Sequence, residues 1–234
     1  MEINNQIKIY FQRYFEELTW LNAKYDLIMK ISEFMRNNDT IRKNLDTLFS
    51  VLVESLKTDF TISLSKFLEI KFKHIDDNLK KAGERSNCNL IKFLIEIKNI
   101  NSNIDISEDL ESLKNSKIYI ENLIIFRDKY HTHFDIEYFN DPDLLKDIKP
   151  LRWIDLKNLV ELINKILNKY SSVLEEKGYY PHLREIELEI PFFLNIIKDY
   201  FDRIKLEKEN YINSLHVDDK YKNNILNKNK IMEE

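Results

Sequence analysis

The stretch from residue 118 to residue 135, IYIENLIIFRDKYHTHFD, decides how this chain is interpreted. Its apolar side chains recur at helical spacing, which predicts a helix with one face turned toward a core. Those side chains belong to Ile118, Ile120, Leu123, Ile124, Phe126, Tyr130 and Phe134. At the end of this apolar run an arginine, a carboxylate and two imidazoles follow within one short segment. The same segment therefore indicates both a central helix and the part of the chain best suited to chemistry.

The composition of the whole chain predicts an all-α fold. Its 234 residues include only 2 Gly and 4 Pro, whereas a β-rich protein of this size needs many turns. Charged residues make up 32% of the chain and hydrophobic residues 43%, a balance typical of long amphipathic helices.

Apolar periodicity predicts further helices on both sides of the central one. They are expected at residues 7–34, 41–68, 90–97 and 153–174, with a last helix that begins near Glu189 or Pro191. The polar segment 37–40 is expected to separate the first two helices, and the pattern breaks again near residues 82–83. Trp20 and Trp153 lie in apolar stripes and are expected in the core.

No composition shift divides the chain, which predicts one helical domain over residues 1–217. The polar residues 218–234 are expected to form a frayed or extended tail. The lone Cys88 and the lack of any run of about 18 apolar residues predict a soluble, cytoplasmic protein with no membrane partner.

The formal net charge of -4 gives the protein no overall positive field. This argues against a protein that coats DNA without sequence preference, because such proteins neutralise many phosphates. An enzyme with a local basic cleft remains open.

The spacing of the charged motif poses a geometric problem. On an ideal helix Arg127 and His131 lie one turn apart on the same face, whereas His133 lies about 240° around the axis from Arg127. One helix therefore does not aim Arg127 and His133 at a single atom unless it is distorted. A symmetric dimer removes the difficulty, because each copy can supply one group to a shared cleft.

The order Arg127-Asp128-Lys129, then His133 and Asp135, resembles the signature of the HEPN superfamily and most closely its abortive-infection branch. Thr132 departs mildly from the small alanine that is usual before the histidine. Residues 59–68 and the Lys- and Asp-rich segment 75–81 are similar to the second conserved helix of the family and its exit. The resemblance extends over about residues 41–169, and only the central motif in it is specific. It implies a HEPN-like helical bundle with additional N- and C-terminal helices that dimerises around the motif helix.

The active members of this family are metal-independent endoribonucleases, so the resemblance implies RNA as substrate and no cofactor. Cleavage proceeds by attack of a ribose 2′-OH and leaves a 2′,3′-cyclic phosphate. His133 suits proton transfer near neutral pH, and Arg127 offers a planar donor fork for phosphate. Asp128 is expected to orient Arg127 or the histidine of the partner copy. A toxin or abortive-infection effector of this kind also needs restraint, which predicts an antitoxin or regulatory protein as a possible partner.

Three further motif residues are predicted to bind substrate. Lys129 suits phosphate attraction, and Tyr130 suits packing or base stacking. His131 is either a second titratable group on the face of Arg127 or a packing residue. His74 stands alone in the sequence and is expected to face solvent.

Other interpretations of the motif remain. It can belong to a non-catalytic HEPN-like module that binds RNA or protein, to a solvated helix end, or to a helical interaction protein without the HEPN fold. A metal site built from His131, His133 and Asp135 is disfavoured, because alternate residues diverge on a helix and no fourth ligand lies near them in sequence.

Overall fold

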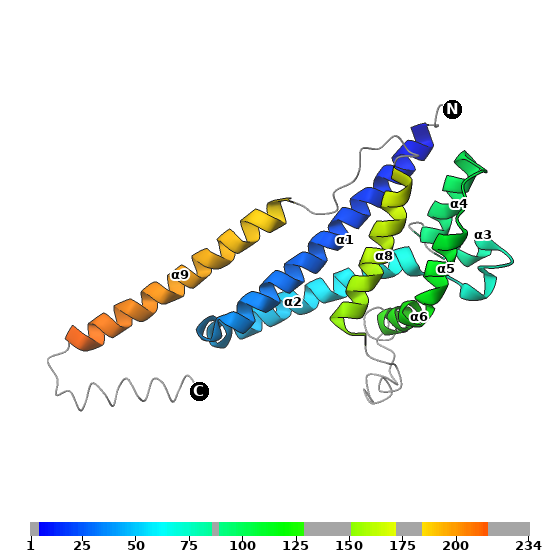
Figure 1. Ribbon diagram of the computed structural model, residues 1–234. Coiled ribbons are helices and arrows are strands. Elements are labelled where there is room, and N and C mark those ends of the chain that lie inside the picture. Colours follow the sequence, from blue (N-terminus) through cyan, green and yellow to red (C-terminus); the bar gives the residue numbers. More distant parts are fainter. Residues whose placement is uncertain (1–4, 86–88, 129–150, 172–183, 215–234) are drawn as a thin grey trace. The chain divides into compact units, whose positions relative to one another are not determined.

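A computed structural model describes residues 5–85, 89–128, 151–171 and 184–214, and every regular element in these ranges is helical (Figure 1). The predicted all-α class is therefore confirmed. The elements are α1 (Asn5–Asn37), α2 (Asp39–Leu68), the 3₁₀ helix η1 (Phe72–His74), α3 (Leu79–Ala82), α4 (Leu90–Ile100), α5 (Ser107–Asn115), α6 (Lys117–Phe126), α8 (Trp153–Ser171) and α9 (Arg184–Ser214).

The chain forms two compact units, each built from segments that are distant in sequence. The first unit comprises residues 1–25 and 57–183, and the second comprises residues 26–56 and 184–234. The long helices α1 and α2 each contribute residues to both units. The expectation of one domain over residues 1–217 stays a prediction, and the tail at 218–234 lies outside the described residues.

The predicted break between the first two helices is confirmed. Only Asn38 separates α1 from α2. The Asn38 side-chain amide donates to the carbonyl of Phe34 at 2.8 Å, and the Asn38 carbonyl accepts from the Arg42 amide at 2.9 Å. Asn38 thus satisfies a terminal carbonyl of one helix and begins the hydrogen-bond ladder of the next.

An aromatic cluster forms the centre of the first unit. The ring of Phe93 on α4 lies 5.1 Å from that of Phe11, 5.5 Å from that of Tyr14 and 6.1 Å from that of Tyr170. These contacts join α4 to α1 and α8. The surrounding apolar core is contributed by Leu18, Leu21, Phe60, Leu64, Phe67, Leu94, Ile120, Leu123, Ile163 and Leu167.

Helix α5 was not predicted from the sequence, because one of its two buried positions is polar. Asp109 is only 3% exposed and accepts hydrogen bonds from the Lys169 ammonium at 2.9 Å and from the Tyr170 hydroxyl. Burial and the bond to Asp109 raise the pKa of Tyr170 to about 12. A charged, hydrogen-bonded side chain therefore joins α5 to α8 where an apolar pattern would have made the helix recognisable.

The second unit packs α9 against the ends of α1 and α2 that meet at Asn38. Its core contains Ile31, Ile41, Phe49 and Leu194, with Ile190, Ile197 and Phe201 of α9 packed against them. The predicted start of α9 at Glu189 or Pro191 was wrong, since the helix begins at Arg184. Pro191 lies inside it, where the missing amide removes one backbone hydrogen bond without ending the helix.

The two tryptophans have different environments. Trp153 is partly buried, and its ring lies 6.2 Å from the rings of both Tyr25 and Phe60, so it packs at the edge of the core. Trp20 is 59% exposed, so the expectation of a place in the core was wrong for it. Trp20 lies about 200° around α1 from Leu18, which is fully buried, and therefore projects from the opposite face.

None of the helices in the described ranges combines the length and apolarity needed to cross a membrane.

We predict that Asp109→Ala lowers the free energy of unfolding by about 2–4 kcal/mol, because the partners on α8 lose their buried acceptor. The measurement is urea unfolding followed by circular dichroism. Glu111→Ala is the matched control, since its side chain on the same helix is 63% exposed. The control is expected to change stability by less than about 0.5 kcal/mol, and equal losses in both variants would contradict the role of Asp109.

Candidate functional site

The motif lies at a local change in helix geometry. Helix α6 buries Ile120 and Leu123 and ends at Phe126, and Arg127 and Asp128 continue it in a wider π-helical turn. Such turns insert a residue into the regular ladder and are frequent at functional sites. The backbone of Arg127 itself keeps α-helical angles, and its amide donates to the carbonyls of Leu123 and Ile124.

Arg127 is held by two carboxylates and a hydroxyl. Its Nη2 donates to Glu69 Oε1 at 3.1 Å and to Asp128 Oδ1 at 2.6 Å, and its Nε donates to the same Asp128 oxygen at 2.8 Å. Its Nη1 donates to Ser65 Oγ at 3.3 Å. The side chains of Arg127 and Glu69 are only 13% and 18% exposed. Contacts along both edges of the guanidinium fix its plane as well as its position.

The environment keeps Arg127 charged. Burial alone would lower the pKa of its guanidinium, but the hydrogen bonds that it donates to Glu69 and Asp128, together with their negative charges, raise the pKa above its ordinary value. The ion pairs therefore offset the desolvation of a partly buried cation.

A second layer of hydrogen bonds positions Glu69. The Asn89 side chain donates to the Glu69 carbonyl at 2.6 Å, while its Oδ1 accepts from the Ile91 amide at 2.8 Å and caps α4. The Asn89 carbonyl in turn accepts from the Tyr14 hydroxyl at 3.1 Å. Asn89 is fully buried, so it connects the exit of α2 to the core of the first unit.

The structure brings together part of the predicted site. Arg127 and Asp128 are in contact, as expected if Asp128 orients the arginine. The other predicted residues, Lys129, Tyr130, His131 and His133, lie outside the described residues, as does the alternative metal site that includes Asp135. Among the residues described, no three His, Cys, Asp or Glu side chains are grouped so as to hold a metal ion.

Sequence reasoning missed Glu69 and Ser65. Glu69 lies 58 residues before Arg127, and the sequence near it shows no motif that marks it as a partner. The one visible signal was Asn89 ahead of an apolar run, a helix cap that indirectly places Glu69.

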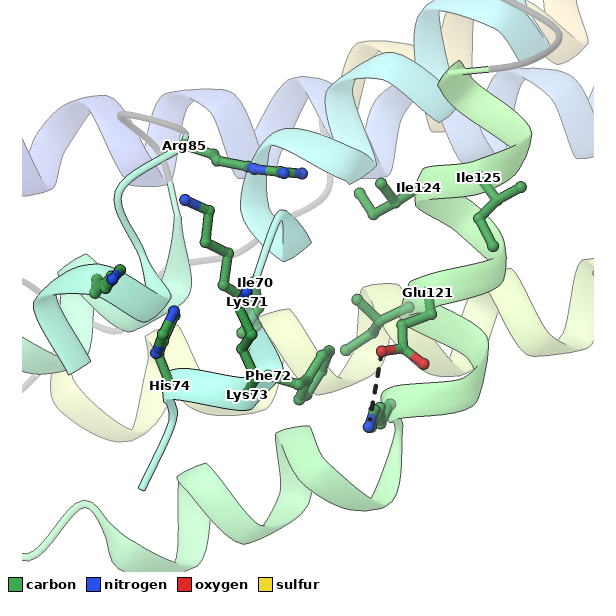
Figure 2. Close-up of a pocket in the computed structure, with 12 residues that line it drawn as sticks. Ile70, Lys71, Phe72, Lys73, His74, Arg85, Glu121, Ile124 and Ile125 are labelled. Carbon is green, nitrogen blue, oxygen red and sulfur yellow. Dashed lines mark ion pairs between the residues drawn. The ribbon is translucent and has the colours of Figure 1, made fainter. Parts of the chain in front are cut away.

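A groove of about 710 Å³ lies beside this ion-pair cluster. One wall is the segment from the exit of α2 through η1 and α3, and the other is α6 (Figure 2). The described residues that line this groove include the lysine and arginine side chains of Lys71, Lys73, Lys81, Arg85 and Lys117. We call it the basic groove. Ile124 lines the groove one turn before Arg127, and Ile70, which directly follows Glu69, lines it too.

The charge of the basic groove contrasts with the net charge of the whole chain. Glu121 is the single carboxylate among the described residues that line it, and this group pairs with Lys117 at 3.8 Å (Figure 2). Lys71 pairs with Glu84. Cationic side chains are therefore grouped in this groove although the chain as a whole carries a net negative charge.

His74 lies among these lysines. It is partly buried and lines the groove, so the expectation that it stands alone in solvent was wrong. Desolvation and the positive charges of Lys81, Lys73 and Lys71 lower its pKa. Desolvation is the larger cause and the lysine charges act in the same direction.

No family model, curated protein or solved structure matches this chain at a significant level. The assignment of function therefore rests on the motif and on the geometry of the described residues.

We predict measurable coupling between Arg127 and Glu69. A double-mutant cycle of Arg127→Ala and Glu69→Ala is expected to give a coupling energy of about 1–2 kcal/mol in urea unfolding, because each group is partly buried and charged. The control cycle removes Lys114 and Asp76, whose side chains are 34% and 73% exposed. Its coupling is expected to be below about 0.5 kcal/mol, and equal coupling in both cycles would show that the Arg127 pair is an ordinary surface contact.

Proposed function

We propose that this protein is a metal-independent endoribonuclease whose active site contains Arg127, Asp128 and His133. The observation that carries the proposal is the oriented, permanently charged Arg127 next to the basic groove. A fixed guanidinium suits stabilisation of the charge that develops on a phosphate, and a neighbouring positive groove attracts an RNA strand. The resemblance of the motif to the HEPN superfamily supports the same reaction.

The reaction would transfer phosphorus between two oxygens of the RNA. The ribose 2′-oxygen forms a bond to the adjacent phosphorus while the bond from phosphorus to the 5′-oxygen breaks. One imidazole accepts the 2′-OH proton, and the imidazolium so formed or a water molecule donates a proton to the leaving 5′-oxygen, which leaves a 2′,3′-cyclic phosphate and a 5′-OH. His133 would carry proton transfer and Arg127 would stabilise the phosphorane charge, with Asp128 and Glu69 holding the arginine plane.

Lys129, Tyr130 and His131 follow directly after the anchored pair. In this proposal Lys129 attracts phosphate, Tyr130 stacks on a base, and His131 binds near the arginine. None of these roles requires a metal ion or another cofactor.

We further propose that the active site is completed by a second copy of the chain. Helix α6 exposes Ile118 and Ile125, with 63% and 39% of their surfaces accessible. These residues are seven positions apart and therefore lie on one face of the helix. An apolar face on the motif helix suits a homodimer in which Arg127 of one copy meets His133 of the other.

The cellular role that suits such an enzyme is that of a toxin or abortive-infection effector in antiviral defence. RNA cleavage without control harms the cell that makes the enzyme. An antitoxin or other regulatory protein is therefore part of the proposal.

A non-catalytic RNA-binding or protein-interaction module is the second candidate. It is favoured by the engagement of Arg127 with Glu69, Asp128 and Ser65, which is also what a purely structural arginine would show. Only cleavage separates the two candidates, because both use the basic groove.

We predict that the purified protein cleaves total cellular RNA in the presence of EDTA and that Arg127→Ala and His133→Ala each lower the rate at least about 100-fold. Products are resolved on gels, and their ends are tested for cyclic phosphate. Arg203→Ala, an exposed arginine on α9, and His216→Ala are the matched controls and should retain the parental rate. An intact parent that cleaves nothing would support the non-catalytic module, and cleavage by all variants alike would mean that the site is elsewhere.

We also predict that the two inactive variants complement each other. In an equimolar mixture half of the dimers are mixed, and each mixed dimer retains one intact pair of Arg127 and His133 from opposite copies. The mixture should therefore recover about a quarter of the parental activity. Ile118→Asp should abolish this recovery and give a monomer by light scattering. Full inactivity of the mixture, with dimers intact, would contradict a site shared in this way.

A further inference from the structure

We propose that the basic groove is the subsite that binds the ribose-phosphate backbone of single-stranded RNA and leads the strand to Arg127. This inference rests on the proposed function for the identity of the strand. The residues that line the groove lie outside the motif, so the role of the groove is inferred from different residues.

The distribution of charge supports a polyanion as the ligand. Lys73, Lys81 and Arg85 are exposed side chains that line one wall. Among the described lining residues no carboxylate lies on that wall, although Glu84 outside the groove pairs with Lys71. Figure 2 shows Lys71 and Arg85 extending toward the same space from this wall. The whole chain has a net charge of -4, so an anionic ligand would be attracted to these grouped cations and not to the protein surface in general.

The opposite wall supports a nucleotide strand over a simple inorganic anion. Ile124 of α6 contributes partly exposed apolar surface, and Phe72 supplies an aromatic ring at the floor of the same groove (Figure 2). The ammonium of Lys117 lies 5.9 Å from the centre of that ring. Grooves that bind single strands combine cations for the backbone with apolar and aromatic surfaces for the bases.

The size and position of the groove favour a single strand over a duplex. A volume of about 710 Å³ is that of a small-ligand pocket and receives individual nucleotides rather than a paired helix. Arg127 follows Ile124 by one turn, and Glu69 directly precedes Ile70, so one end of the groove is next to the ion-pair cluster. A strand bound there would reach the proposed catalytic arginine without a further binding surface.

The test measures binding apart from cleavage, using the full-length protein and a fluorescent 2′-O-methyl oligoribonucleotide. This probe lacks the nucleophilic 2′-OH and cannot be cleaved by the proposed reaction. We expect Lys73→Glu with Lys81→Glu to weaken binding at least about tenfold and to reduce the salt dependence of log K by about 1.4, since two phosphate contacts are lost.

The matched control is Lys198→Glu with Lys205→Glu on α9, which changes the net charge equally at exposed positions outside the groove. It should leave probe binding unchanged. Equal weakening in both double variants, or no weakening in either, would overturn the assignment, as would equally tight binding of a duplex.

In the parent, the probe should also raise the pKa of His74, measured by NMR, because bound phosphate offsets the lysine charges that contribute to lowering that pKa. A parent that binds the probe through these lysines but never cleaves RNA would refute the endoribonuclease while retaining the subsite.

Discussion

The arrangement of the chain where α2 ends depends on one constraint. The guanidinium of Arg127 is partly buried and must be paired with negative charge. Arg127 is 13% exposed, and without Glu69 and Asp128 its charge would be costly to desolvate. Asn89 donates to the Glu69 carbonyl and caps α4 with the same side chain, so it ties the backbone at Glu69 to the start of α4. The charge on α6 is therefore satisfied by the way α2 and α4 join the core, and the basic groove begins where these elements meet.

Two kinds of cation lie side by side in this region and suit different tasks. Arg127 stays charged, is ion-paired with carboxylates and is fixed in plane. A guanidinium held in this way suits orientation toward one atom. Lys73 and Lys81 are exposed on the neighbouring wall and suit a ligand with repeated negative charge. The proposed ribonuclease activity rests on this arrangement of a guanidinium fixed in plane next to a cationic groove.

Much of the fold could be predicted from local patterns. The scarcity of Gly and Pro indicated helices, and the polar interruption at Asn38 marked the end of α1, because local hydrogen bonding alone ends a helix there. Helix α5 and the exposure of Trp20 could not be predicted in this way. A buried Asp109 carries no apolar signal, and a tryptophan next to a buried stripe does not reveal which face of the helix it shares.

The sequence by itself determined the helical class and the candidate motif, because both depend on residues that are close together along the chain. Arg127 and Asp128 are adjacent, so their contact could be expected from sequence alone. Only the tertiary structure decided that Glu69 and Ser65 complete the setting of Arg127 and that lysines from residues 71–81 face α6 across a groove. These partners are distant in sequence and meet only when the helices pack, since packing of the apolar faces determines which polar ends are brought together.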